Sequence, residues 1–164
     1  MATNTTFIHS QLLATKGNTL ILPNTAVAEI VKYTDPETVE NAADWVLGMF
    51  VWRGLKIPLI SFEAVTGQAK PVVSHSSRIA VLNTLDNNTA LQFFAIVTQG
   101  IPRLLNVDKD NITTVAVEAE HDVIMANVMV NNINALIPNI DAIEKMLERE
   151  GYTVSVYQQE AVAN

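Results

Sequence analysis

The stretch WVLGMFVWRGLKIPLISFE, residues 45–63, decides the fold of this chain. Its two apolar runs predict two short buried strands, Val46 to Trp52 and Lys56 to Phe62, around a tight turn at Arg53 and Gly54. Gly54 can adopt the positive φ that such a turn requires. Arg53 then lies at a strand end, where its stem rests on apolar surface while its charge reaches outward. No acid adjoins it in the sequence, so the pattern favours a protein-contact site over a catalytic site.

The rest of the chain consists mainly of short β-type runs between turn residues. One amphipathic helix is predicted over Ile140 to Glu150, with Asn139 as its N-cap and Gly151 just after its end. A second, short helix is predicted to start at Asp35. Many short strands with spaced turns indicate a barrel or a sandwich. The predicted strands outside the hairpin cover residues 19–22, 26–33, 78–85, 90–98, 112–118, 123–130, 133–137 and 152–157.

No composition shift divides the chain, so we expect one domain over residues 1–164. Its two ends, residues 1–16 and 158–164, are expected to be flexible. Residues 67–77 are predicted to form a mobile loop, and residues 85–89 a hairpin turn.

The composition excludes several classes of protein. Charged residues make up 16% of the 164 residues, below the roughly 25% usual for soluble domains, so part of the surface is expected to be a contact surface. The net charge is −7 and the 10 basic residues are scattered, which argues against nucleic-acid binding. The absence of cysteine excludes disulfides and thiolate chemistry. No signal peptide or membrane-length apolar run is present, so a cytoplasmic protein without membrane insertion is expected.

The sequence predicts no catalytic residue, metal site or cofactor. The 3 histidines, His9, His75 and His121, lie far apart, and none has a second ligand at metal spacing. His121 lies in the acidic stretch EAEHD, for which a solvated turn is favoured over a general base. His75 lies among serines in the expected mobile loop, a poor place to hold a nucleophile. No G-x-S-x-G, P-loop or G-x-G-x-x-G motif is present.

Two rival functions nevertheless stay open at this stage. Trp45, Phe50 and Trp52 could line the cavity of a small-ligand-binding β-barrel, although aromatic residues at strand spacing more often form a core. A hydrolase would use His75 or His121, because the members of a catalytic triad need not be neighbours in sequence.

Four segments, in this order and at compatible spacing, resemble the CheW family of bacterial chemotaxis adaptors. The most specific is GMFVWRGLKIPLISFE, residues 48–63, whose Arg53, Gly54 and Pro58 match the Arg-Gly turn and the proline of that family. Val51 and Trp52 depart from its Asn-Leu before Arg-Gly, and residues 101–120 align poorly. The chain is thus similar to a divergent member, such as the pilus-linked type. The other segments are TLILPNTAVAEIVKY (19–33), RIAVLN (78–83) and NALIPNIDAIEKML (134–147).

The resemblance implies a mainly β fold of two small SH3-like β-barrel subdomains that share a core, with a C-terminal helix. It also implies a non-catalytic scaffold in signal transduction at receptor arrays. One surface of such an adaptor pairs with the regulatory domain of a CheA-type histidine kinase. A groove between the barrels receives the cytoplasmic tip of a chemoreceptor.

The resemblance further implies a set of partner-binding residues. The planar fork of Arg53 is suited to carboxylates or backbone carbonyls on a receptor helix, and Gly54 permits the turn that aims it. Apolar contacts are expected from strand 26–33 and from strand 78–85, which would form the other wall of the groove. The residues after the turn would support the hairpin or contact the kinase, and the proline among them suits an edge strand. The full set is Val27, Glu29, Ile30, Arg53, Gly54, Ile57, Pro58, Ile79 and Val81.

Overall fold

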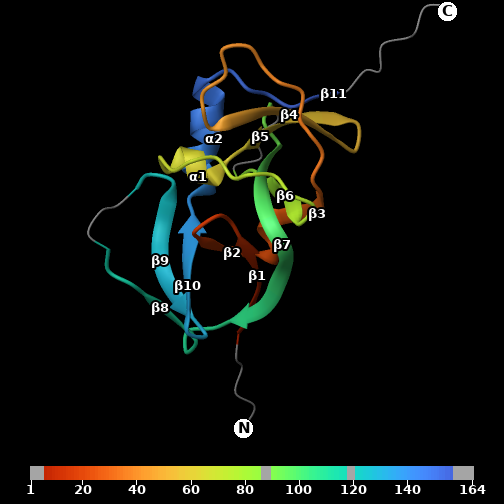
Figure 1. Cartoon of the computed structure of the whole chain (residues 1–164). Helices are drawn as coiled ribbons and strands as arrows, with labels where there is room; N and C mark the ends of the chain where they lie inside the picture. The colour runs from red at the N-terminus through yellow and green to blue at the C-terminus, as the bar shows by residue number, and fades with distance from the viewer. Residues whose placement is uncertain (1–5, 86–89, 118–120, 157–164) are drawn as a thin grey trace, which may run out of the picture.

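The structure is a computed structural model that describes residues 6–85, 90–117 and 121–156 of the chain. Its elements follow the order shown in Figure 1. They are β1 (Ile8–Ala14), β2 (Thr19–Pro23), the 3-10 turn η1 (Asn24–Ala26), β3 (Val27–Lys32), β4 (Val46–Trp52), β5 (Leu55–Ile60), α1 (Phe62–Val65), β6 (Ser77–Asn83), β7 (Phe93–Val107), β8 (Ile112–Thr114), β9 (Ile124–Val130), β10 (Ile133–Pro138), α2 (Ile140–Arg149) and β11 (Ser155–Val156).

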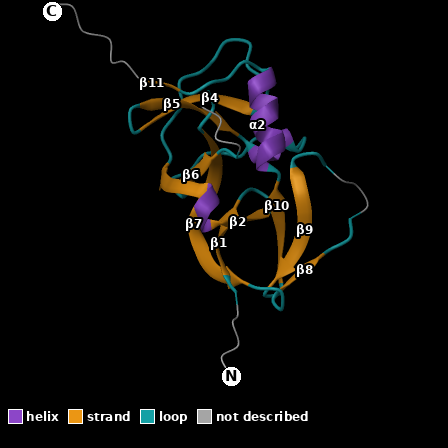
Figure 2. Ribbon diagram, turned by 180° about the vertical axis from the view of Figure 1, so that it is seen from behind, coloured by secondary structure: helices purple, strands orange, loops and turns teal. Residues whose placement is uncertain are grey.

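The described strands form one continuous sheet that curls into two small subdomains, and both subdomains use strand β7 (Figure 1 and Figure 2). The first subdomain has the strand order β4-β5-β7-β6-β3, and the second has the order β7-β1-β2-β10-β9-β8. Between the described residues, the sheet does not close on itself in either subdomain through backbone hydrogen bonds. The predicted fold, mainly β with two SH3-like subdomains and a C-terminal helix, is confirmed, with an open sheet in place of closed barrels.

Strand β7 connects the subdomains because its two halves pair with different neighbours. Phe93 to Gln99 pair with β6, and Arg103 to Val107 pair with β1. Between the halves, Gly100 has a φ of +66°, a backbone conformation that favours glycine. Its N–H donates to the carbonyl oxygen of Ser76 at 2.8 Å, which fixes the bend against the start of β6.

The core consists of three apolar clusters, one inside each subdomain and one shared between them. Alternate residues of β7 divide between them because successive strand side chains point to opposite faces. Ala95 and Val97 lie in the first subdomain, whereas Phe94 and Ile96 lie in the shared cluster. The interior of the second subdomain is lined by Leu12, Ile21, Val107, Val128, Val130 and Ala135.

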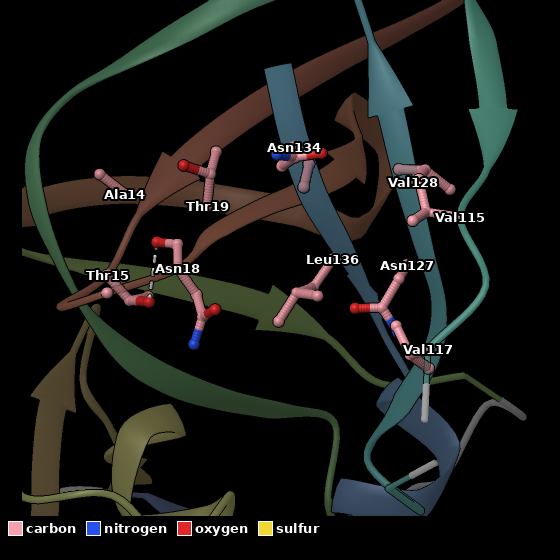
Figure 3. Close-up of a pocket in the computed structure, with 12 residues that line it drawn as sticks. Ala14, Thr15, Asn18, Thr19, Val115, Val117, Asn127, Val128, Asn134 and Leu136 are labelled. Atoms are coloured by element: carbon pink, nitrogen blue, oxygen red, sulfur yellow. Dashed lines mark hydrogen bonds between the residues drawn. The ribbon is translucent and has the colours of Figure 1, made fainter. Parts of the chain in front are cut away.

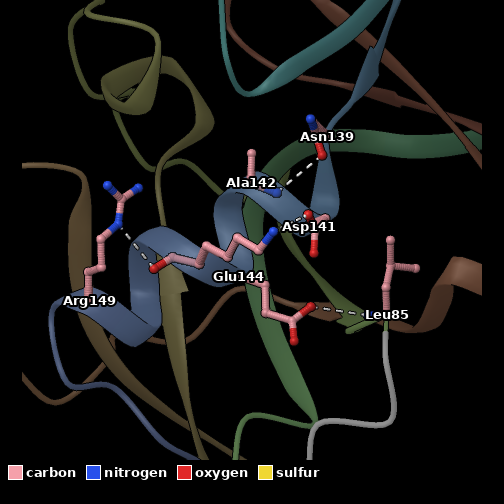
Figure 4. Close-up of polar contacts among 7 residues, drawn as sticks. Leu85, Asn139, Asp141, Ala142, Glu144 and Arg149 are labelled. Carbon is pink, nitrogen blue, oxygen red and sulfur yellow. Dashed lines mark hydrogen bonds and ion pairs between the residues drawn. The ribbon is translucent and has the colours of Figure 1, made fainter.

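Helix α2 closes the shared core, as predicted. The Asn139 side chain accepts the N–H of Ala142 at 3.1 Å, so it is the expected N-cap. Figure 4 shows this cap and the carboxylate of Glu144, which accepts the N–H of Leu85 at 3.2 Å. Ile143 and Leu147 pack into the shared cluster. Gly151 follows the helix with a φ of +84°.

Two expectations about the chain before the hairpin are wrong. The segment starting at Asp35 forms no helix, because Glu37 pairs with Met49 on the free edge of β4 through two backbone bonds of 2.9 and 2.8 Å. Residues 8–14, expected to be flexible, form β1, which pairs with both β2 and β7. The burial of Leu12 and Leu13 explains why this segment is ordered and not flexible.

The later segments mostly follow the prediction. The β9–β10 hairpin turns at Asn131 and Asn132, both with positive φ. Helix α1 was not predicted, β7 continues past the predicted end to Val107, and β8 ends at Thr114. The predicted turn at 85–89 includes residues outside the described part, and the expected flexible end at 158–164 lies outside it entirely. No helix in the described ranges is long and apolar enough to cross a membrane.

Substituting Gly48 tests the close approach between β4 and the segment before it. A Cβ on Gly48 would collide with the carbonyl oxygen of Glu37, and the φ of Gly48 is +147°. Gly48→Ala should therefore lower the free energy of unfolding by about 3 kcal/mol. Gly67→Ala is the matched control, since its φ is +85° and nothing lies within 4 Å; we expect a loss of about 1 kcal/mol. Urea unfolding measures both, and equal losses would contradict the predicted collision.

Candidate functional site

The β4–β5 turn places two residues in the left-handed backbone region. Arg53 has a φ of +47° and Gly54 a φ of +76°, the pair of values that a tight two-residue hairpin turn requires. The sequence predicted this conformation only for Gly54. A residue other than glycine adopts the left-handed backbone conformation at a cost of about 1–3 kcal/mol. The surrounding hairpin must therefore hold Arg53 in this conformation.

One carboxylate oxygen organises the residues around this turn. Glu29 on β3 accepts the indole N–H of Trp52 at 2.8 Å and the Nε–H of Arg53 at 3.1 Å, both at Oε2. The Arg53 guanidinium also lies 5.1 Å from the centroid of the Trp52 ring, within the range of a cation–π contact. We call Glu29, Trp52 and Arg53 the hairpin cluster. An acid therefore does accompany the arginine, but it comes from another strand.

The hairpin cluster leaves the arginine accessible. The side chain of Arg53 is 68% exposed, while Trp52 is buried and contacts Phe93 edge to face with ring centroids 5.0 Å apart. Within the described residues, the terminal amino groups of the Arg53 guanidinium make no hydrogen bond. These groups remain able to bind a carboxylate or a carbonyl oxygen from a partner.

The other predicted contact residues divide between surface and interior. Val27 and Ile30 are half-buried beside the shared core. By contrast, the four predicted residues on β5 and β6 are buried. For the two on β5, burial agrees with the expected support of the hairpin, whereas the two on β6 do not form an exposed groove wall. All four support the hairpin and the sheet from inside the first subdomain. These residues are Ile57, Pro58, Ile79 and Val81.

Pro58 also does not lie on an edge strand. β5 lies between β4 and β7, and it pairs with β7 only at Leu59 and Ile60. On the same side, β11 pairs with Leu55 and Lys56. Pro58 lies between the residues that pair with β11 and those that pair with β7. The N–H that proline lacks is therefore not needed for a hydrogen bond to either strand.

A second exposed feature lies on β7 and was missed by the sequence argument. Ala14 pairs with Gln99 but Leu12 pairs with Arg103, so extra residues of β7 bulge out opposite β1. Ile101 is 83% exposed and Leu104 is 74% exposed, so both present large aliphatic surface to solvent. We call residues 100–104 the β7 bulge. Gly100 and Pro102 mark it in the sequence, since both residues interrupt regular pairing.

The β7 bulge lies on a strand that is linked to β3 through β6. Lys32 pairs with Arg78, and Arg78 pairs with Thr98. These residues share one face of the sheet, and Thr98 comes shortly before the bulge. The bulge therefore begins on the strand that joins the two subdomains, and strand β6 separates it from β3.

The titratable groups outside the hairpin cluster include one tyrosine and two histidines. Burial, followed by the nearby carboxylate of Asp35, raises the pKa of Tyr33 above its ordinary value of 10.0, so the phenol stays neutral at neutral pH. His75 is exposed in the loop before β6, and His121 accepts the N–H of Val123 at 3.2 Å. Among the described residues, no group of three or more His, Cys, Asp or Glu side chains is placed to hold a metal ion.

Substitution of Glu29 separates its two hydrogen bonds from its charge. Glu29→Ala leaves the buried indole N–H of Trp52 without an acceptor and should cost about 1–2 kcal/mol of stability. Glu29→Gln keeps an acceptor oxygen and removes only an exposed ion pair, so its cost should stay below about 1 kcal/mol. Urea unfolding, with the indole N–H resonance of Trp52 as a local probe, measures the difference. If both variants lose the same stability, the shared-oxygen arrangement is contradicted.

The comparisons with known proteins agree with this architecture. The family model described as the CheW-like domain matches residues 12–148. Among solved structures, the chain is similar to the scaffolding protein TtCheW from Thermoanaerobacter tengcongensis, with a TM-score of 0.70 and 15% sequence identity over 85% of this chain and 89% of that chain. None of the curated proteins matches the chain. Because the family model spans most of the chain, this protein belongs to the family of CheW-like domains.

Proposed function

We propose that this protein is a non-catalytic chemosensory adaptor that couples chemoreceptors to a CheA-type histidine kinase at cytoplasmic receptor arrays. Membership of the CheW-like domain family supports the adaptor role. So does the similarity to a solved structure named as a scaffolding protein. The single observation that carries the proposal is the hairpin cluster, in which Arg53 is exposed and already oriented by Glu29.

The hairpin cluster is the proposed polar contact with the receptor tip. Arg53 is held by one Nε–H bond, so the terminal amino groups of its guanidinium are available for a carboxylate or a helix-end carbonyl. Because the bond to Glu29 and the contact with the Trp52 ring restrict the side chain before binding, less conformational entropy is lost on association.

The β7 bulge is the proposed apolar contact of the adaptor. Ile101 and Leu104 expose large aliphatic surface, and burying such surface against a partner is favourable by roughly 25 cal/mol per Å². Val27 and Ile30 remain proposed contributors on β3, since both are partly accessible. The kinase regulatory domain would bind a separate surface, so that receptor and kinase can be held at the same time.

The two rival functions have less support from the geometry. Phe50 and Trp52 pack within the core cluster of the first subdomain, and Trp45 packs against the shared cluster. These positions favour a structural role for the aromatic residues over a ligand cavity. His75 and His121 are both exposed, and neither lies in a preorganised site of the kind that a hydrolase requires.

A titration with a charge reversal tests the proposed contact. The chain is titrated by calorimetry with a soluble receptor-tip fragment and with the regulatory domain of a CheA-type kinase from the same cell. Arg53→Glu should weaken receptor binding about 10- to 100-fold, since a charge-assisted hydrogen bond is lost and repulsion is added. Kinase binding should change little, because the kinase would use another surface.

Lys109→Glu is the matched control, because Lys109 is an exposed cation in the β7–β8 turn, away from the hairpin. It makes the same charge change and should leave receptor affinity within about twofold. Circular dichroism confirms that each variant is folded. Equal losses in both variants would reject the Arg53 contact, and the absence of binding to either partner would reject the adaptor function.

A further inference from the structure

A cavity of about 530 Å³ lies in the second subdomain, with a lining that contains no residue of the hairpin cluster or the β7 bulge. One side is the turn between β1 and β2, another is formed by β9 and β10, and a third by Val115 and Val117. Figure 3 shows Asn18 and Asn127 on opposite sides of Leu136. The cavity therefore brings together three parts of the chain that are distant in sequence.

Three carboxamides line this cavity and are unused by the fold. Asn18, Asn127 and Asn134 come from three different segments, and within the described residues their side chains make no hydrogen bond. Each carboxamide offers both donors and an acceptor. The three carboxamides therefore face a space with room for a ligand.

The charge of the lining residues determines which ligand charge the cavity favours. None of the described residues that line the cavity carries a titratable side chain, although the whole chain has a net charge of −7. A charged ligand would lose its hydration without gaining an ionic partner. Carboxamides beside the apolar Val115, Val117 and Leu136 instead suit an uncharged group that both donates and accepts hydrogen bonds.

The β1–β2 wall of the cavity is fixed before any ligand arrives. Lys16 donates its backbone N–H to Oε1 of Glu63 at 3.1 Å, and Ser61 donates its hydroxyl to Oε2 at 2.9 Å. Glu63 is only 1% exposed. Thr15 closes the turn through two bonds to the carbonyl oxygen of Asn18, at 2.8 and 3.0 Å. A wall held in this way lowers the ordering cost of binding.

We propose that this cavity is a binding site for an uncharged ligand bearing an amide group, held by the carboxamides of Asn18, Asn127 and Asn134. The peptide group has this chemistry, so the ligand is either a free small amide or an uncharged peptide segment of another chain. The site is separate from the proposed receptor contacts, since its lining shares no residue with the hairpin cluster or the β7 bulge.

Nuclear magnetic resonance of the full chain tests the site with acetyl-valine N-methylamide as the probe. We expect saturable shifts of the side-chain NH₂ resonances of Asn18, Asn127 and Asn134. Asn127→Leu keeps the side-chain volume but removes one hydrogen-bonding group, so it should weaken binding about tenfold. Gln92→Leu is the matched control, because Gln92 is an exposed carboxamide outside the cavity, and it should leave the affinity unchanged. Asn134→Leu is a second test if Asn127→Leu does not fold.

Other outcomes overturn the proposal. Shifts that do not saturate, an Asn127→Leu affinity equal to that of the wild type, or equal binding of zwitterionic valine would each exclude a site built for neutral amides. A longer probe, acetyl-Val-Thr-Val N-methylamide, distinguishes the two sources. Affinity about tenfold higher than that of the short probe supports a peptide segment, and equal affinity supports a free small amide.

Discussion

The central constraint on this structure is that one strand belongs to both subdomains. β7 is 15 residues long, and its first half pairs with β6 while its second half pairs with β1. Its alternating side chains also contribute to the first subdomain and to the shared core. Neither subdomain can complete its sheet without this strand, so the two are expected to fold as one cooperative unit. The bend at Gly100 permits both pairings and also creates the bulge that exposes Ile101.

The hairpin cluster connects the interior of the first subdomain to its surface through a single oxygen atom. Oε2 of Glu29 satisfies the buried indole of Trp52 and restrains the exposed guanidinium of Arg53. A buried N–H would otherwise be left unpaired, at a cost of about 1–3 kcal/mol. The same carboxylate therefore serves both stability and the orientation of the arginine. Together with the β7 bulge, it gives the chain a polar and an apolar exposed feature on strands of one sheet, an arrangement suited to binding another protein.

The sequence predicted the local features well and the long-range ones poorly. The hairpin over residues 45–63 and helix α2 depend on turn residues, caps and periodicity, all of which are local. The pairing of Glu29 with Arg53 joins residues 24 positions apart, so no local pattern indicated it. Ile79 and Val81 were placed on a groove wall, but they pack in the core cluster of the first subdomain. β1 was also missed, although only its pairing with β7 is long-range and its pairing with β2 crosses a short turn.

Hydrogen–deuterium exchange, measured on the free chain and on its mixture with a soluble receptor-tip fragment from the same cell, tests the central claim most directly. Amides in the β4–β5 turn and in residues 100–104 should exchange more slowly in the complex, because both exposed features would be covered. Amides in the β7–β8 turn, residues 108–111, should be unchanged. Complex formation that leaves the exchange of both features unaltered would contradict the claim that the hairpin cluster and the β7 bulge bind the receptor.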